Sequence, residues 1–213
     1  MGKQVAKELV ANGVTVYVGS RDLARGEAAA AERVRVEFGR LDLLVNNAGI
    51  SNTGNGDRTP EQMTAASKSS TATLDEIRAV WEVNVCGVLA VYQAMLPLLR
   101  ESSDARIVNV SSGVGSLASN AGPSFPDHSI YGPVYPPSKA AENASVLAMM
   151  IELESTDIKV NLVSPGYPST ALNNFSGTES LEDGSREVVR VALLGPDGPT
   201  DTFTRWENAT IPW

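Results

Sequence analysis

The stretch Leu41-Asp-Leu-Leu-Val-Asn-Asn-Ala-Gly49 joins a short apolar run to a loop of small and polar residues. An apolar run bounded by turn residues predicts a buried strand, here over 41–45. Three more predicted strands end in the same way: 14–18 before Gly19-Ser20-Arg21, 106–110 before Ser111-Ser112-Gly113, and 159–163 before Ser164-Pro165-Gly166. Residues of these types allow close approach of a ligand to the backbone, although turns favour them for their own sake.

Helical patterns separate these strands. Apolar residues at helical spacing predict helices over 3–12, 22–39, 74–99 and 135–154, and a weaker pattern lies near 181–194, before a short strand near 203–206. Strands that alternate with helices indicate an α/β fold with a doubly wound parallel sheet and helices on both faces. We expect one domain over residues 1–213, with ligands at the carboxyl ends of the strands.

Composition excludes several functions. The chain has 213 residues, a formal net charge of −8 and a pI near 4.7, which argues against a nucleic-acid partner. One cysteine and one histidine rule out an internal disulfide and make a metal site or a histidine-based triad a poor expectation. The apolar runs are too short for a membrane span, and we expect a cytoplasmic protein with no membrane partner.

Tyr135 and Lys139 begin the helix predicted after residue 134. Residues four apart lie on one helix face, so the ammonium group would lie near the phenol. A free tyrosine has a pKa of about 10, and a neighbouring positive charge lowers it. Such a pair can therefore serve as a proton donor near neutral pH, although the spacing alone also occurs by chance.

Several further motifs accompany this pair in a fixed order. They are Asn47-Ala48-Gly49, Asn84-Val-Cys-Gly87, Ser111-Ser112, Tyr135-x-x-x-Lys139 and Pro165-Gly166 with Thr170 four residues later. With these motifs the chain resembles the classical short-chain dehydrogenases/reductases over nearly its whole length. Its ending, Gly198-Pro-Thr and Phe203-Thr-Arg-Trp206, is similar to that of the carbonyl-reductase-like members.

The resemblance implies hydride transfer between a nicotinamide cofactor and a small carbonyl or alcohol substrate. In that scheme Tyr135 is the general acid, Lys139 lowers its pKa and binds the nicotinamide ribose, and Ser112 binds the substrate oxygen. Ser112 matches the family serine better than Ser111 does. Asn84 would hold a water in a proton relay, or it would merely satisfy backbone groups.

The same resemblance places the cofactor. It assigns Gly2 to the pyrophosphate turn, Asn47, Ala48 and Gly49 to the cofactor edge of the sheet, and Pro165, Gly166 and Thr170, with Tyr135 and Lys139, to the nicotinamide end. An acidic residue about 20 positions after the glycine motif binds the ribose of NAD, whereas an arginine suits the 2′-phosphate of NADP. Arg21 lies 19 residues after Gly2, so we expect NADP, with NAD the less favoured alternative.

The chain also departs from the family pattern. The first strand and most of the glycine-rich turn that should precede 3–12 have no counterpart, and a helix–strand unit is lacking between 14–18 and 41–45. We therefore expect a chain truncated at its N-terminus and shortened internally. The strand at 14–18 would then either pair with 41–45 or leave an open groove.

Three functions remain open on these grounds. The first is an active NADP-dependent oxidoreductase, the second a catalytically silent homologue that acts, if at all, through protein contacts, and the third an NADP-sensing protein. The intact Ser112, Tyr135 and Lys139 favour the first. The sequence leaves the substrate undetermined, as well as the choice between a monomer and a homo-oligomer.

Overall fold

A five-stranded sheet forms the centre of the molecule. The computed structural model describes residues 1–19, 23–54, 66, 68–122, 128 and 131–213. The strands follow one another in space as they do along the chain: β1 (Leu43–Asn46), β2 (Arg106–Val110), β3 (Lys159–Val163), β4 (Thr202–Arg205) and β5 (Ala209–Thr210). The first four are parallel, and β5 pairs with β4 in the antiparallel sense.

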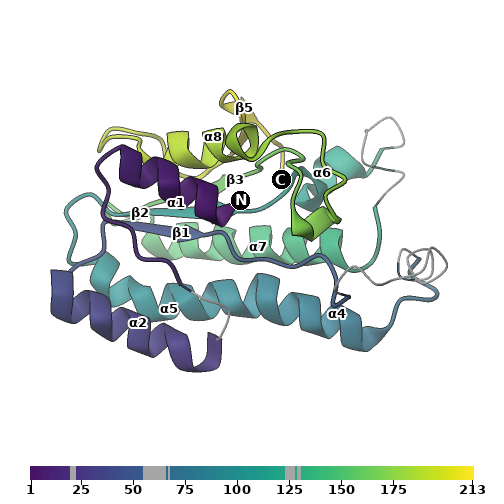
Figure 1. The fold of residues 1–213 in the computed structure, drawn as a ribbon, viewed down its shortest axis with the longest axis horizontal. Helices are drawn as coiled ribbons and strands as arrows, with labels where there is room; N and C mark the ends of the chain where they lie inside the picture. The colour runs from purple at the N-terminus through teal and green to yellow at the C-terminus, as the bar shows by residue number, and fades with distance from the viewer. Residues whose placement is uncertain (20–22, 55–65, 67, 123–127, 129–130) are drawn as a thin grey trace.

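Helices cover both faces of the sheet (Figure 1). One face carries α2 (Leu23–Phe38), α5 (Gly87–Leu99) and α7 (Tyr135–Leu153), and the other carries α1 (Gly2–Ala11) and α8 (Leu181–Ala192). The α/β architecture with a mostly parallel sheet is therefore confirmed. The sequence did not predict β5, whose two residues are too few for a periodic pattern.

Each face of the sheet has its own apolar core. Side chains of β2 and β3 alternate between the faces, as strand geometry requires. Ile107 and Leu162 pack with the larger cluster, which includes Leu98 and Phe203, whereas Val108 joins the cluster under α1 and α8. The strand ends are thereby held rigidly between two layers of helices.

The predicted long helix over 74–99 is present but changes its winding. It consists of α4 (Leu74–Trp81), a π-helical turn over Glu82–Cys86, and α5. Among the described helices, Leu74–Leu99 is the one long and apolar enough to cross a membrane by length and composition, with a mean hydropathy of 1.5. At its C-terminal end, Leu98 and Leu99 are fully buried against the sheet.

The strand predicted over 14–18 is wrong. These residues have no strand pairing, and in the described part of the chain β1 pairs with β2 alone. A β-branched run becomes a strand only when a partner supplies its ladder hydrogen bonds, and none lies beside it. Of the two alternatives for this segment, the open groove is the one observed.

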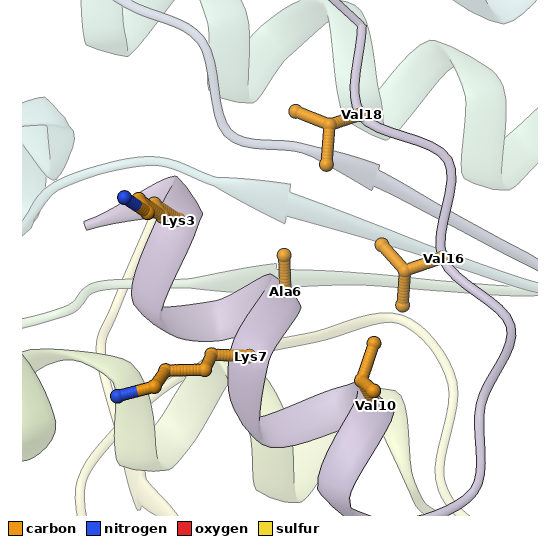
Figure 2. A pocket seen from close by; sticks show the side chains of 6 residues that line it. All are labelled: Lys3, Ala6, Lys7, Val10, Val16 and Val18. Carbon is orange, nitrogen blue, oxygen red and sulfur yellow. The ribbon is translucent and has the colours of Figure 1, made fainter.

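This groove lies between α1 and residues 14–18. It is a pocket of about 320 Å³ whose valines face one another across the gap, as Figure 2 shows. Val18 is 75% exposed and Val10 57% exposed, so apolar surface that a further layer would cover is open to solvent. The lining residues are Lys3, Ala6, Lys7, Val10, Val16 and Val18.

Candidate active site

The predicted catalytic residues meet at the carboxyl end of the sheet, where α7 begins. Tyr135 is the first residue of α7, and Pro136 and Pro137 occupy its first turn. Proline is tolerated there because the first N–H groups of a helix have no intrahelical partner. The rigid first turn therefore presents Tyr135 at the helix start, with Lys139 one turn further on.

Tyr135 lies between Ser112 and Lys139. The Lys139 Nζ is 6.0 Å from the centre of the Tyr135 ring, and the Ser112 side chain lies close enough to the phenol to lower its pKa. Burial raises the pKa of Tyr135 above its ordinary 10.0, whereas Lys139 and Ser112 lower it. Burial is the strongest of these effects, so the net shift of the Tyr135 pKa is upward.

Lys139 is itself buried and has two partners. Its Nζ donates to the carbonyl oxygen of Val110 at 3.0 Å and to Glu142 Oε2 at 2.5 Å. Burial lowers the pKa of this ammonium, but Glu142 and Tyr135 outweigh burial, so the pKa lies above 10.5. The sequence analysis missed Glu142, although its position three residues after Lys139 could have indicated a contact on one helix face.

Asn84 lies fully buried in the π-helical turn. Its Oδ1 accepts the Ile50 N–H at 2.9 Å, and its Nδ2 donates to the Ile50 carbonyl at 2.8 Å and to Ser138 Oγ at 2.9 Å. Ser138 Oγ in turn donates to the carbonyl of Tyr135 at 2.7 Å. Asn84 therefore joins the loop after β1 to the first turn of α7, which is the simpler of its two predicted roles.

The two serines after β2 are distinguished by burial. Ser111 is buried, and its Oγ donates to Asn143 Oδ1 at 2.5 Å on α7. Ser112 is half-buried and contacts Tyr135. The geometry thus places Ser112 beside the phenol and gives Ser111 a packing role.

The loop after β1 lies against the same site. A Cβ added at Gly49 would be 3.3 Å from Asn84 Oδ1 and 3.6 Å from Lys139 Nζ. A Cβ at Gly2 would lie 2.6 Å from Asn47 Nδ2, so the start of α1 contacts this loop as well. Asn47 Oδ1 is buried without a hydrogen-bond partner, and the neighbouring Ala48 is exposed.

The residues after β3 are held by local contacts. Gly166 has a φ of 77°, a left-handed conformation that favours glycine, and a Cβ there would also collide with the Glu179 carboxylate. Thr170 caps the short helix Ala171–Asn173, and its hydroxyl accepts the Leu172 N–H at 3.3 Å. Pro165, next to Gly166, is half-buried.

A contact across the site links its two sides. Ser51 Oγ donates to the carbonyl of Leu172 at 2.5 Å, so the short helix after β3 reaches the loop after β1. Arg21, the residue on which the NADP expectation depends, lies outside the described residues. Within the described ranges there is no group of His, Cys, Asp and Glu side chains that could hold a metal ion.

Sequence comparisons identify relatives of this chain. The family model for short chain dehydrogenases matches residues 3–180. The short-chain dehydrogenase anuI of Penicillium roqueforti is 38% identical over 193 residues, which cover 85% of this chain and 69% of that protein. Salutaridine reductase of Papaver somniferum is 26% identical over 287 aligned positions, which cover 95% of this chain and 90% of that protein. That alignment is longer than this chain of 213 residues, so the poppy enzyme has internal segments without a counterpart here.

Structure comparisons agree with this result. The structure of salutaridine reductase from Papaver somniferum matches with a TM-score of 0.75 and 25% identity and covers 95% of both chains. NADPH-bound carbonyl reductase from chicken fatty liver has the same fold, with a TM-score of 0.72 at 22% identity over 99% of this chain and 82% of that one. The family match, the relatives and the arrangement around Tyr135 together show that this chain belongs to the short-chain dehydrogenase/reductase family.

Proposed function

We propose that this chain is an NADP-dependent oxidoreductase that interconverts a carbonyl compound and its alcohol. The observation that carries the proposal is the arrangement of Ser112, Tyr135 and Lys139 at the carboxyl end of the sheet. In such folds ligands bind at that edge, beyond the ends of the strands. A hydroxyl and a phenol that contact each other there can both hydrogen-bond one substrate oxygen.

Each residue has a distinct role in this proposal. Tyr135 donates its proton to the substrate oxygen during reduction and takes it back during oxidation. Ser112 donates a hydrogen bond to the same oxygen and stabilises the negative charge that develops on it. Lys139 keeps a positive charge near the phenol and has a third donor beyond those used by Val110 and Glu142.

The residues around the site fit a nicotinamide cofactor. The partnerless Asn47 Oδ1 offers an acceptor, and Gly49 leaves the backbone open in front of Lys139. The first N–H groups of α1, which begins at Gly2 beside Asn47, suit a phosphate. When bound, the nicotinamide would supply or accept the hydride at the substrate carbon.

NADP is favoured over NAD by Arg21 and by similar structures. The chicken carbonyl reductase is described as NADPH-bound, and a short-chain dehydrogenase/reductase from Burkholderia multivorans as holding NADP. A ligand that binds only the folded state stabilises it by RT ln(1 + [L]/Kd), about 2.7 kcal/mol at 100 times Kd. We therefore expect NADPH to raise the melting temperature more than NADH does, and Arg21→Ala to reduce that difference.

The direct test is Tyr135→Phe, which removes the phenol hydroxyl and its proton and keeps the aromatic ring. We expect NADPH oxidation with a panel of aldehydes and ketones in the wild type and no turnover in the variant, with the NADPH-induced rise in melting temperature retained in both. Turnover by Tyr135→Phe would disprove the assignment. A melting curve that neither cofactor moves at millimolar concentration would disprove the oxidoreductase proposal for this chain.

The open groove supports a second candidate. The exposed Val18 and the half-buried Val16 opposite α1, together with the outer edge of β1, would suit a chain that has lost cofactor binding and acts through protein contacts. The same melting experiment separates the two candidates, since a silent homologue binds neither NADPH nor NADH.

A further inference from the structure

Glu142 is a buried carboxylate beside the proposed catalytic pair. It is 1% exposed and lies three residues after Lys139 on α7. Its Oε2 is 2.5 Å from Lys139 Nζ, whereas its Oε1 is buried without a hydrogen-bond partner. Burial raises the pKa of the Glu142 carboxyl above its ordinary value, and the contact with the Lys139 ammonium opposes that rise by favouring the carboxylate.

The groups from other described elements that lie against the site are uncharged. The carbonyl of Val110 comes from β2, Ser112 from the loop after it, Asn84 from the π-helical turn and Gly49 from the loop after β1. The charged groups that act on Tyr135 are Lys139, which lowers its pKa, and Glu142, which raises it. Of these two opposite charges Lys139 has the larger effect on the phenol, and Glu142 offsets part of it.

A lysine alone and a lysine with a carboxylate act differently on a phenol. An ammonium within about 4–6 Å favours the phenolate and lowers a pKa by about one to three pH units. A carboxylate in contact with that ammonium leaves a neutral pair, whose field falls off more steeply with distance than that of a single charge. The phenol then retains its proton to a higher pH.

We propose that Glu142 is a positioning residue that holds the Lys139 ammonium and offsets its charge, so that Tyr135 stays protonated well above neutral pH. For the reaction under Proposed function, on which this part rests, reduction is thereby favoured: Tyr135 enters with its proton and transfers it to the substrate oxygen. Alcohol oxidation requires the phenolate and proceeds only at alkaline pH.

The test that needs no turnover is an ultraviolet titration of Tyr135, read as phenolate absorbance and corrected with Tyr135→Phe for the other tyrosines. Glu142→Gln keeps the size of the side chain and removes its charge, and we expect the Tyr135 midpoint to fall by about one pH unit or more. Glu142→Asp keeps the charge and should restore the midpoint toward the wild-type value.

Glu187→Gln is the matched control. Glu187 is also 1% exposed and also pairs with a cation three residues away, Arg190, which follows it where Lys139 precedes Glu142; Glu187 lies on α8 and does not act on Tyr135. The Tyr135 midpoint in Glu187→Gln should equal that of the wild type. An unchanged midpoint in folded Glu142→Gln would overturn the proposal, and so would an equal shift in both variants.

A second variant decides the question if Glu142→Gln does not fold. Lys139→Met combined with Glu142→Leu removes both charges, and apolar replacement of a buried ion pair is often tolerated. If the charges offset each other, the Tyr135 midpoint stays close to that of the wild type. A midpoint at least about one pH unit higher would show that Lys139 acts uncompensated and would overturn the proposal.

Kinetics distinguish this inference from the proposed function. If the wild type turns over, the alkaline pH needed for alcohol oxidation should fall in Glu142→Gln by the same shift as the titration midpoint. A pH profile that does not move overturns the role of Glu142 while the proposed function stands. If the wild type neither binds NADPH nor turns over, the proposed function fails, and the titration alone decides the role of Glu142.

Discussion

Replacing Asn84 by alanine should destabilise the protein by about 3 kcal/mol. The side chain makes three hydrogen bonds, two to the backbone of Ile50 and one to Ser138 Oγ, each between 2.8 and 2.9 Å. A typical intramolecular hydrogen bond contributes about 1 kcal/mol net, and a buried group left unsatisfied costs more. Ser138 retains its hydrogen bond to the Tyr135 carbonyl in the variant, so losing the bond from Asn84 to Ser138 should cost no more than about 1 kcal/mol.

Urea unfolding followed by circular dichroism measures this difference, provided that the slope with urea is unchanged. Asn12→Ala is the control, because Asn12 is exposed and makes one side-chain hydrogen bond, to the Glu8 carbonyl. It should cost less than about 1 kcal/mol. An ordinary surface substitution changes the free energy of unfolding by no more than about 0.5 kcal/mol. A change that small in Asn84→Ala would show that the hydrogen bonds between the β1 loop and α7 do not stabilise the protein, and would refute the reasoning.

Gly115→Ala should cost about 1–3 kcal/mol in thermal unfolding, because the new Cβ would lie 2.9 Å from the Lys139 carbonyl carbon; Gly195→Ala, with open space around it, should cost far less. Leu98→Ala should cost about 2–5 kcal/mol in the same assay, against little for the exposed Leu74→Ala. Cys86 is exposed, but partial burial of its thiol and the neighbouring Glu82 raise its pKa, so less thiolate is present at neutral pH. Iodoacetamide should therefore label it more slowly than free cysteine, with a rate that keeps rising above pH 9; fast labelling at neutral pH would contradict this.

Much of the fold follows from local patterns. The helices around Lys7, Val146 and Val188 lie where apolar periodicity and turn residues predict them, because each pattern is complete within one element. The strand over 14–18 failed for the opposite reason: its residues favour a strand, but a strand exists only with a neighbour, and pairing is not a local property.

The candidate site shows the same division. The spacing of Tyr135 and Lys139 and the motif around Ser112 were enough to predict which residues meet, since a helix turn and a strand end place them without further information. Two contacts could not be predicted from local spacing, because their partners are distant in the sequence or brought close by loop folding. Asn84 binds Ile50, 34 residues away in the chain, and Gly166 adjoins Glu179 through the folding of a loop.

The sequence by itself therefore determined the family, the parallel α/β sheet and which tyrosine and lysine are the proposed proton donor and its partner. Tertiary structure decided the surroundings: the burial that raises the pKa of Tyr135, the Glu142 carboxylate that meets Lys139, and the open groove beside α1. The physical reason is that periodicity and spacing act within one element. Burial, ion pairing and strand pairing instead depend on which elements come together in space.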